Sequence, residues 1–204
     1  MLKTIAVTGS IASGKSTVCS FFKEWGAAIF DADTTVHHAA THNHTIHQAL
    51  IELLGEEIFK GNTIQRNRIL EILMKKPHLL TSLEQIYHPY VLTTMHHEIQ
   101  KAKKASFAYF VAEIPLLFES HYFRHQTFER TIAVISDPKI AISRYLERGG
   151  TIDQFSFLEK WQLPIDQKSK LADHTLINNG TVEELYRASY QLFLDLCRDH
   201  KNEN

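Results

Sequence analysis

Residues 9–16 constrain the fold of this chain more than any other stretch, because they read GSIASGKS and fit the pattern G-x-x-x-x-G-K-[ST] at every position. An apolar, β-branched run at 3–8 precedes them, and an amphipathic stretch at 16–25 follows them. The motif therefore lies between a predicted strand and a predicted helix, the setting that a phosphate-binding loop requires. An incidental turn rich in glycine and serine is the alternative interpretation.

The residue types in this loop suit a polyphosphate ligand. Backbone N–H groups surround the phosphate oxygens, and the positive end of the next helix is directed at the same anion. Lys15 is expected to reach the β- and γ-phosphates of a nucleotide, and the hydroxyl of Ser16 is expected to ligate Mg²⁺. The other residues predicted to bind the nucleotide are Gly9, Ser10, Ile11, Ala12, Ser13, Gly14 and Thr17.

Apolar patterning along the chain predicts strands that alternate with helices. The expected strands are at 3–8, 27–33, 107–114, 130–136 and 173–178, and the expected helices are at 16–25, 138–150, 151–164 and 181–200. Residues 34–104 are expected to be mostly helical, as an insertion after the second strand. This order indicates an α/β fold with a doubly wound, five-stranded parallel sheet, whose ligands bind at the carboxyl ends of the strands.

Composition excludes several classes of function. The chain has 204 residues, 44% hydrophobic and 22% charged, which is ordinary for a single globular domain. A formal net charge of −1 argues against a broad surface for nucleic acid or an anionic membrane. Cys19 and Cys197 lie far apart, as expected of free thiols in a reducing compartment, and no segment approaches the ~20 apolar residues of a membrane span. We therefore expect a cytoplasmic protein with neither nucleic-acid nor membrane partners.

Five histidines gather in one short stretch of the predicted insertion. They are His37, His38, His42, His44 and His47. A metal site is one interpretation, because helical spacing brings His38 and His42 onto one face. No cysteine or carboxylate completes a familiar pattern, however, which favours a polar, solvated surface.

Two acids, Asp31 and Asp33, end the second predicted strand. A carboxylate at the carboxyl end of that strand can accept a proton from an attacking hydroxyl or hold Mg²⁺ through water. Asp33 also precedes a helical stretch, so a role as its N-cap is the alternative. Its placement favours catalysis.

Arg144 and Arg148 are one helical turn apart and are followed by two glycines. Two guanidinium groups on one side of a helix suit a lid that closes over a nucleotide and stabilises charge on the transferring phosphoryl group. Two solvated arginines on a surface helix are the alternative.

Taken together, these residues resemble the dephospho-coenzyme A kinase family of P-loop NTPases over about residues 4–185. A phosphate loop alone is shared by many proteins, but the order of the motifs here is more specific. After TGSIASGKST come DAD at 31–33, Arg66, His88-Pro89, PLLFE at 115–119, Arg144 and Arg148, Gln162, Ala172-Asp173, and Asn178-x-Gly180.

The resemblance implies a reaction and its participants. In that family the γ-phosphoryl group of ATP·Mg²⁺ passes to the ribose 3′-hydroxyl of dephospho-coenzyme A, the last step of coenzyme A synthesis. Asp33 is then the base, Lys15 and Arg144 stabilise phosphoryl charge, and Asn178 belongs to the nucleotide site. The implied substrate-binding residues are Thr8, Asp33, Arg66, His88, Pro115, Leu116, Leu117 and Glu119. Thr8, Ser16 and Thr17 line the phosphate and metal site.

The resemblance also implies how the chain is divided. Residues 1–204 form one kinase domain, in which 34–104 is the acceptor-binding insertion and 144–165 is the lid. Phosphoryl transfer to a hydroxyl requires that water be excluded, and a lid provides this. Glu119 follows the third predicted core strand, where it belongs either to the site or to a buried turn that begins with proline.

The chain departs from the family pattern at four positions. Ser10 and Ala12 stand where glycine is usual, and Leu92 and Leu158 stand where arginine is frequent. If Ala12 adopts a positive φ, this costs on the order of 1 kcal/mol. Loss of the two arginines affects the expected contacts to acceptor phosphate and in the lid.

Two other functions fit parts of the pattern. Another P-loop small-molecule or nucleoside monophosphate kinase would share the loop but use a different acceptor. A nucleotide-dependent switch would bind tightly without transfer, although the chain lacks the N-K-x-D signature of guanine specificity.

Overall fold

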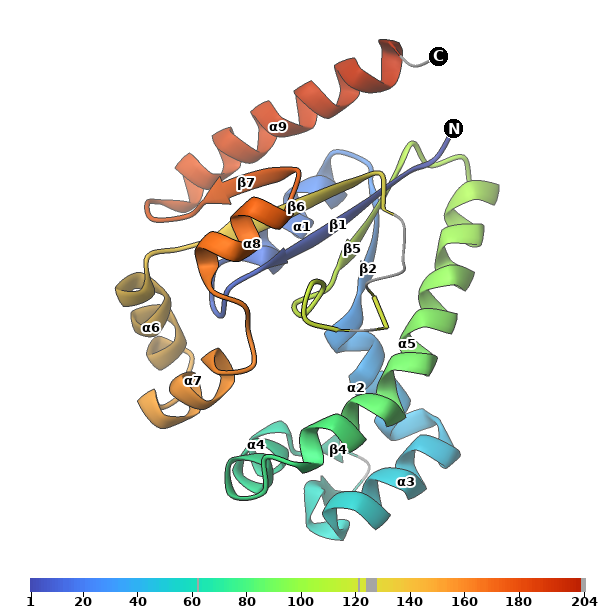
Figure 1. The fold of residues 1–204 in the computed structure, drawn as a ribbon. Helices are drawn as coiled ribbons and strands as arrows, with labels where there is room; N and C mark the ends of the chain where they lie inside the picture. Colours follow the sequence, from blue (N-terminus) through green and yellow to red (C-terminus); the bar gives the residue numbers. More distant parts are fainter. Residues whose placement is uncertain (62, 121, 124–127, 203–204) are drawn as a thin grey trace. The chain divides into compact units, whose positions relative to one another are not determined.

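The computed structural model describes residues 1–61, 63–120, 122–123 and 128–202 (Figure 1). The chain separates into two compact units. The first comprises Met1–Phe30 with Lys101–Asn204, and the second comprises Asp31–Gln100. The second unit is therefore an insertion in the sequence of the first.

A five-stranded sheet organises the first unit, with the order β2-β5-β1-β6-β7. Its strands are β1 (Lys3–Gly9), β2 (Ala28–Asp31), β5 (Tyr109–Glu113), β6 (Arg130–Ile135) and β7 (His174–Ile177). The central strand β1 pairs in parallel with β5 and β6, and β6 pairs in parallel with β7. The predicted α/β fold with a five-stranded parallel sheet is confirmed.

Strand register brings the carboxyl ends of neighbouring strands to one edge of the sheet. Val7 is paired with Glu113, Gly9 with Val134, and Ile135 with Ile177. The residues that follow β1, β5, β6 and β7 therefore emerge together. This edge is where ligands bind in sheets of this kind.

Two helices and the sheet enclose the main core of the first unit. Helix α1 (Lys15–Glu24) contacts helix α9 (Val182–Asn202), and buried side chains of both pack against the strands. Phe22 is buried completely and makes edge contacts with Phe193, while Trp25 packs against the same ring. Because α1 is fixed by this aromatic packing, its N-terminus holds the loop of residues 9–14 at the edge of the sheet.

Three shorter helices follow β6, and each begins at a recognisable signal. Helix α6 (Pro138–Glu147) starts at Asp137, whose carboxylate accepts the N–H of Lys139. Helix α7 (Ile152–Glu159) starts with a reciprocal capping box between Thr151 and Gln154. Helix α8 (Ile165–Leu171) starts after Pro164 and was not predicted, because seven residues are too few for a helical period to stand out.

The second unit is mainly helical, as predicted. Its elements are α2 (Ala32–His42), α3 (His44–Leu54), η1 (Glu56–Ile58), α4 (Arg66–Lys75) and α5 (Leu79–Lys104), which continues into the first unit. A short antiparallel hairpin, β3 (Phe59–Lys60) with β4 (Thr63–Ile64), was not predicted. Helix α5 runs through Pro89 without ending there.

None of the helices within the described ranges has the length and apolar character needed to cross a membrane.

Candidate active site

Glycine is required at both ends of the loop. Gly9 has φ 151°, and a Cβ on it would overlap the carbonyl oxygen of Val134. Gly14 has φ 96°, and its missing side chain leaves room for the amide of Asn178. Helix α1 begins at the next residue, Lys15, so the loop ends at a helix N-terminus. The backbone thus has the form of a phosphate cradle.

Ala12 adopts the left-handed conformation that was expected to be costly. Its φ is 51°, one of two positive values among the non-glycine residues that the structure describes. A Cβ in this region costs on the order of 1 kcal/mol. The loop therefore retains a glycine-like path at an energetic cost.

Replacing Ala12 with glycine is expected to raise the free energy of unfolding by about 0.5–1 kcal/mol, because relief of the left-handed strain exceeds the added chain entropy of glycine. Denaturant titration measures this. Ser106→Gly is the matched control, because Ser106 has φ 60° but lies outside the loop. It should give a similar gain in the free energy of unfolding and leave ATP affinity unchanged. A loss of stability in Ala12→Gly would contradict the expectation.

Lys15 folds back over the loop that precedes it. Its ammonium donates to the carbonyl of Ser10 at 2.8 Å and to that of Gly9 at 3.4 Å. The side chain is only partly buried. These contacts hold a positive charge beside the cradle.

Ser16 contacts an acid that the sequence analysis did not single out. Its hydroxyl donates to Glu113 Oε1 at 2.8 Å, and Glu113 is the last residue of β5, 7% exposed. The available signal was an acidic residue at the end of the apolar run YFVA. The pairing of Val7 with Glu113 brings the two chain segments together.

A hydroxyl and a carboxylate are the oxygen donors that Mg²⁺ prefers, and this ion usually takes one or two protein ligands together with substrate phosphates and water. The donor set of Ser16 and Glu113 therefore fits Mg²⁺. Within the described residues there is no group of three or more His, Cys, Asp or Glu side chains that could hold a metal ion. This includes the histidine stretch, where His38 and His42 stack with ring centroids 4.2 Å apart.

Asn178 links the loop to the arginine of α6. Its side-chain N–H donates to the carbonyl of Ser13 at 2.8 Å, and its side-chain oxygen accepts from Arg144 at 3.3 Å. Its backbone carbonyl accepts from Arg144 at 2.9 Å and from Ser136 at 2.8 Å. The structure thus brings two of the predicted nucleotide-binding residues, Asn178 and Arg144, into direct contact.

Asp173 precedes Asn178 in the predicted motif but has a different structural role. Burial opposes ionisation of Asp173, but hydrogen bonds from the N–H and hydroxyl of Thr131, both 2.7 Å, lower the pKa of its carboxyl overall. Those bonds tie the start of β7 to the start of β6. Asp173 therefore orders the sheet at the edge opposite the loop.

A cavity of 380 Å³ opens beside the loop. Ala12, Gly14 and Thr17 line it from one side, and Arg144 and Arg148 line it from the end of α6. The two arginines thus face the same space, as their helical spacing predicted. Its volume suits a small-molecule ligand.

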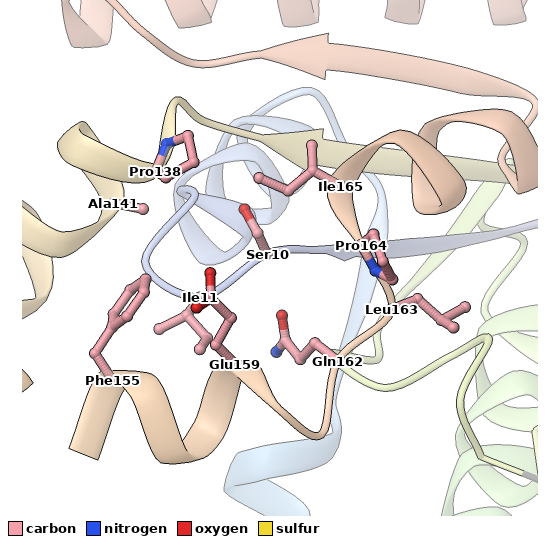
Figure 2. A pocket seen from close by; sticks show the side chains of 10 residues that line it. All are labelled: Ser10, Ile11, Pro138, Ala141, Phe155, Glu159, Gln162, Leu163, Pro164 and Ile165. Carbon is pink, nitrogen blue, oxygen red and sulfur yellow. The ribbon is translucent and has the colours of Figure 1, made fainter. Parts of the chain in front are cut away.

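A second cavity, of 250 Å³, lies between the loop and the segment predicted to be the lid. Figure 2 shows Ser10 and Ile11 of the loop with Phe155 of α7 and Gln162 of the connection to α8. Its remaining lining is largely apolar. The predicted lid segment therefore lies over the loop with space between them.

The stretch PLLFE is joined to β1 and α8 by partly buried polar contacts. The carbonyl of Pro115 accepts from Thr8 Oγ1 and from Lys168 Nζ, both at 3.1 Å. Glu119 Oε1 accepts the N–H of Leu163 at 2.8 Å and lies 2.8 Å from Lys168 Nζ. Leu117 is buried and Leu116 partly so. Substrate binding by these residues stays a prediction.

Lys168 was missed by the sequence analysis. It is completely buried, and burial lowers the pKa of its amine, an effect that the neighbouring Glu119 carboxylate partly offsets. No sequence signal distinguishes it from Lys170, the other lysine of the short segment 165–171.

In the second unit, Asp31 and not Asp33 caps helix α2. Asp31 accepts the N–H of Thr34 at 3.0 Å, and the chain turns into helix directly after it. The capping interpretation of Asp33 is therefore wrong. Asp33 is exposed in the first turn, where the helix dipole favours a carboxylate.

Two other predicted acceptor residues lie in the same unit. Arg66 Nη2 donates to the backbone carbonyl of Asp33 at 3.3 Å. The phenol of Tyr87 has its pKa raised by burial, while the charge of Arg66 acts in the opposite direction. Burial lowers the pKa of His88, which keeps its imidazole neutral near pH 7. Arg66 thus contacts Asp33 and lies close enough to Tyr87 for its charge to act on the phenol.

Comparison with known proteins identifies the family. The family model for dephospho-CoA kinase matches residues 3–184. The chain belongs to the dephospho-CoA kinase family. It is 35% identical over 198 residues to the dephospho-CoA kinase of Protochlamydia amoebophila, a match that covers 96% of this chain and 97% of the relative.

Two solved structures share the fold of this chain. TT1252 from Thermus thermophilus superposes with a TM-score of 0.74 at 27% identity, covering 95% of this chain and 97% of that one. The dephospho-CoA kinase from Campylobacter jejuni shares the fold with a TM-score of 0.67 at 22% identity, covering 98% of this chain and all of that one. The chain is thus a P-loop kinase of the dephospho-CoA kinase family, an ATP-using enzyme of coenzyme A biosynthesis.

Proposed function

We propose that this kinase transfers the γ-phosphoryl group of ATP·Mg²⁺ to the ribose 3′-hydroxyl of dephospho-coenzyme A. The observation that carries the proposal is the cradle of residues 9–14. It directly precedes helix α1, so that Lys15 and Ser16 lie at the N-terminus of this helix. Membership of the dephospho-CoA kinase family supports the choice of acceptor.

In this proposal, residues of the first unit bind the donor. The amides of the loop bind the β- and γ-phosphates, and the ammonium of Lys15 moves from the loop carbonyls to the γ-phosphate. Arg144, already anchored at Asn178, adds positive charge at the nucleotide. The cavity of 380 Å³ receives the rest of the nucleotide.

Ser16 and Glu113 would hold Mg²⁺ through their oxygens. The ion, when bound, neutralises charge on the phosphate oxygens.

Residues of the second unit would bind and activate the acceptor. The carboxylate of Asp33 accepts the proton of the 3′-hydroxyl while the new O–P bond forms and the bond from the γ-phosphorus to ADP breaks. Arg66 and His88 would contact the acceptor, in the insertion at 34–104. The lid at 144–165 would exclude water, so that ATP is not hydrolysed.

A coupled assay of ADP release tests this function. Dephospho-coenzyme A is expected to support turnover, whereas a panel of nucleoside monophosphates and shikimate is not, and the product is identified as coenzyme A by mass. Turnover with a panel member instead would favour another P-loop kinase. Tight ATP binding without turnover on any acceptor would favour a nucleotide-dependent switch.

Replacing Glu113 with glutamine is expected to raise the Mg²⁺ concentration for half-maximal activity about tenfold or more, because a charged oxygen ligand is lost. A titration of Mg²⁺ at saturating ATP measures it. The matched control is Glu24→Gln, an exposed acid at the end of α1, which should leave the titration unchanged. An unchanged midpoint in the Glu113 variant would remove this residue from the metal site.

A further inference from the structure

The ammonium of Lys168 is fully occupied by contacts around the phosphate loop. Its three acceptors are the carbonyl of Gly9 at 3.2 Å, the carbonyl of Pro115 at 3.1 Å and Glu119 Oε1 at 2.8 Å. An ammonium group has three N–H donors, and each has an acceptor here. Because an unpaired buried charge is strongly unfavourable, this arrangement fixes the position of Lys168.

Lys168 shares one acceptor with the catalytic lysine. The carbonyl of Gly9 accepts from Lys15 Nζ at 3.4 Å and from Lys168 Nζ at 3.2 Å. Lys15 must leave the loop carbonyls when it binds a phosphate. A carbonyl without a donor is costly, so a second donor on Gly9 makes that movement easier.

Glu119 holds Lys168 in place and connects it to the end of the predicted lid. The same oxygen that pairs with Lys168 accepts the N–H of Leu163, which precedes α8. The side chain of Glu119 is 12% exposed, so the ion pair is protected from solvent. The cavity of 250 Å³ lies beside this connection and includes Ser10, Leu163 and Pro164 in its lining (Figure 2).

We propose that Lys168, held by Glu119, is a positioning residue for phosphoryl transfer. Its ammonium donates to the carbonyl of Gly9, so that Lys15 is available to bind the phosphates. The inference rests on the proposed function. It assigns to Glu119 a role through Lys168 and the loop rather than through the acceptor.

The test uses a paired substitution, Lys168→Met with Glu119→Gln, which removes both charges together. Glutamine retains an oxygen for the N–H of Leu163, and methionine fills much of the space of the lysine stem, so no unpaired charge is left buried. Lys170→Met is the matched control, because Lys170 lies on the same helix and is exposed.

The paired variant is expected to lower kcat about 10- to 100-fold at saturating substrates, the range expected when a reacting group is misplaced. ATP affinity measured by calorimetry should stay within about threefold, because the loop amides that bind the ground state are retained. The Lys170→Met control should keep kcat within about twofold, as expected of an exposed residue. A role in folding alone would lower the folded fraction and leave kcat per folded molecule unchanged.

A second comparison tests whether the effect passes through Lys15. In a Lys15→Ala background the paired substitution should reduce kcat by less than about twofold further, because residues that act as a unit are not additive. If the paired variant does not fold, Lys168→Leu with Glu119→Gln takes its place, because it also leaves no unpaired charge buried, with the same expected loss of kcat and the same non-additivity.

Two results would overturn the inference while leaving the proposed function intact. One is that the paired variant keeps the wild-type kcat per folded molecule. The other is that its fold-loss of kcat is as large in the Lys15→Ala background as in the wild-type enzyme. A wild-type enzyme that forms no coenzyme A would instead overturn the proposed function.

Discussion

Replacing Asp33 with asparagine is expected to lower kcat about 10²- to 10⁴-fold, the range typical of a lost general base. Asparagine has nearly the shape of aspartate but cannot accept the proton of the 3′-hydroxyl. ATP affinity is expected to remain within about twofold, because in the proposed function the loop of residues 9–14 binds the donor, and the substitution does not change that loop. Single-turnover kinetics measure the first quantity and calorimetry with ATP measures the second.

The neighbouring acid provides the matched control. Asp31→Asn removes a carboxylate two residues away, but asparagine is also a good N-cap, so helix α2 should keep its start at Ala32. Its kcat should stay close to the wild-type value. If Asp33→Asn retained most of the turnover, or if both variants lost it equally, Asp33 would not be the base.

Replacing Lys15 with alanine is expected to lower kcat about 10²- to 10³-fold, as for other groups that stabilise charge in the transition state. The ammonium is held beside the cradle, 2.8 Å from the carbonyl of Ser10, and it exchanges the loop carbonyls for the phosphates when the donor binds. The effect on KM for ATP should be smaller than the effect on kcat, because the charge matters most as the phosphoryl group moves.

Lys23→Ala is the control for Lys15, since Lys23 lies on the same helix and is exposed. Both variants are assayed at saturating ATP and dephospho-coenzyme A. Turnover in Lys15→Ala that equals that of Lys23→Ala would remove the phosphate loop from the mechanism.

The phosphate loop was predictable because its chemistry is local. Eight consecutive residues define the cradle, and the φ angles of Gly9, Ala12 and Gly14 follow from the path that the backbone must take. The alternation of strands and helices is likewise predicted by apolar patterns over short stretches of sequence. The five-stranded sheet could therefore be predicted before the order of its strands was known.

Glu113 and Lys168 could not be predicted in the same way. Glu113 contacts Ser16 across 97 residues, and Lys168 contacts Gly9 across 159. Such contacts depend on strand register and on the path of α8, neither of which has a local signature. Asp33 shows the same limit at short range, because only the turn of the chain after Asp31 decided which acid caps the helix.

Asn178 joins the loop of residues 9–14 to Arg144 through one side chain. Its amide group donates to the carbonyl of Ser13 and accepts from Arg144, so a shift of this one side chain changes both contacts. A substitution at Arg144 would therefore also remove contacts that hold Asn178 against the loop.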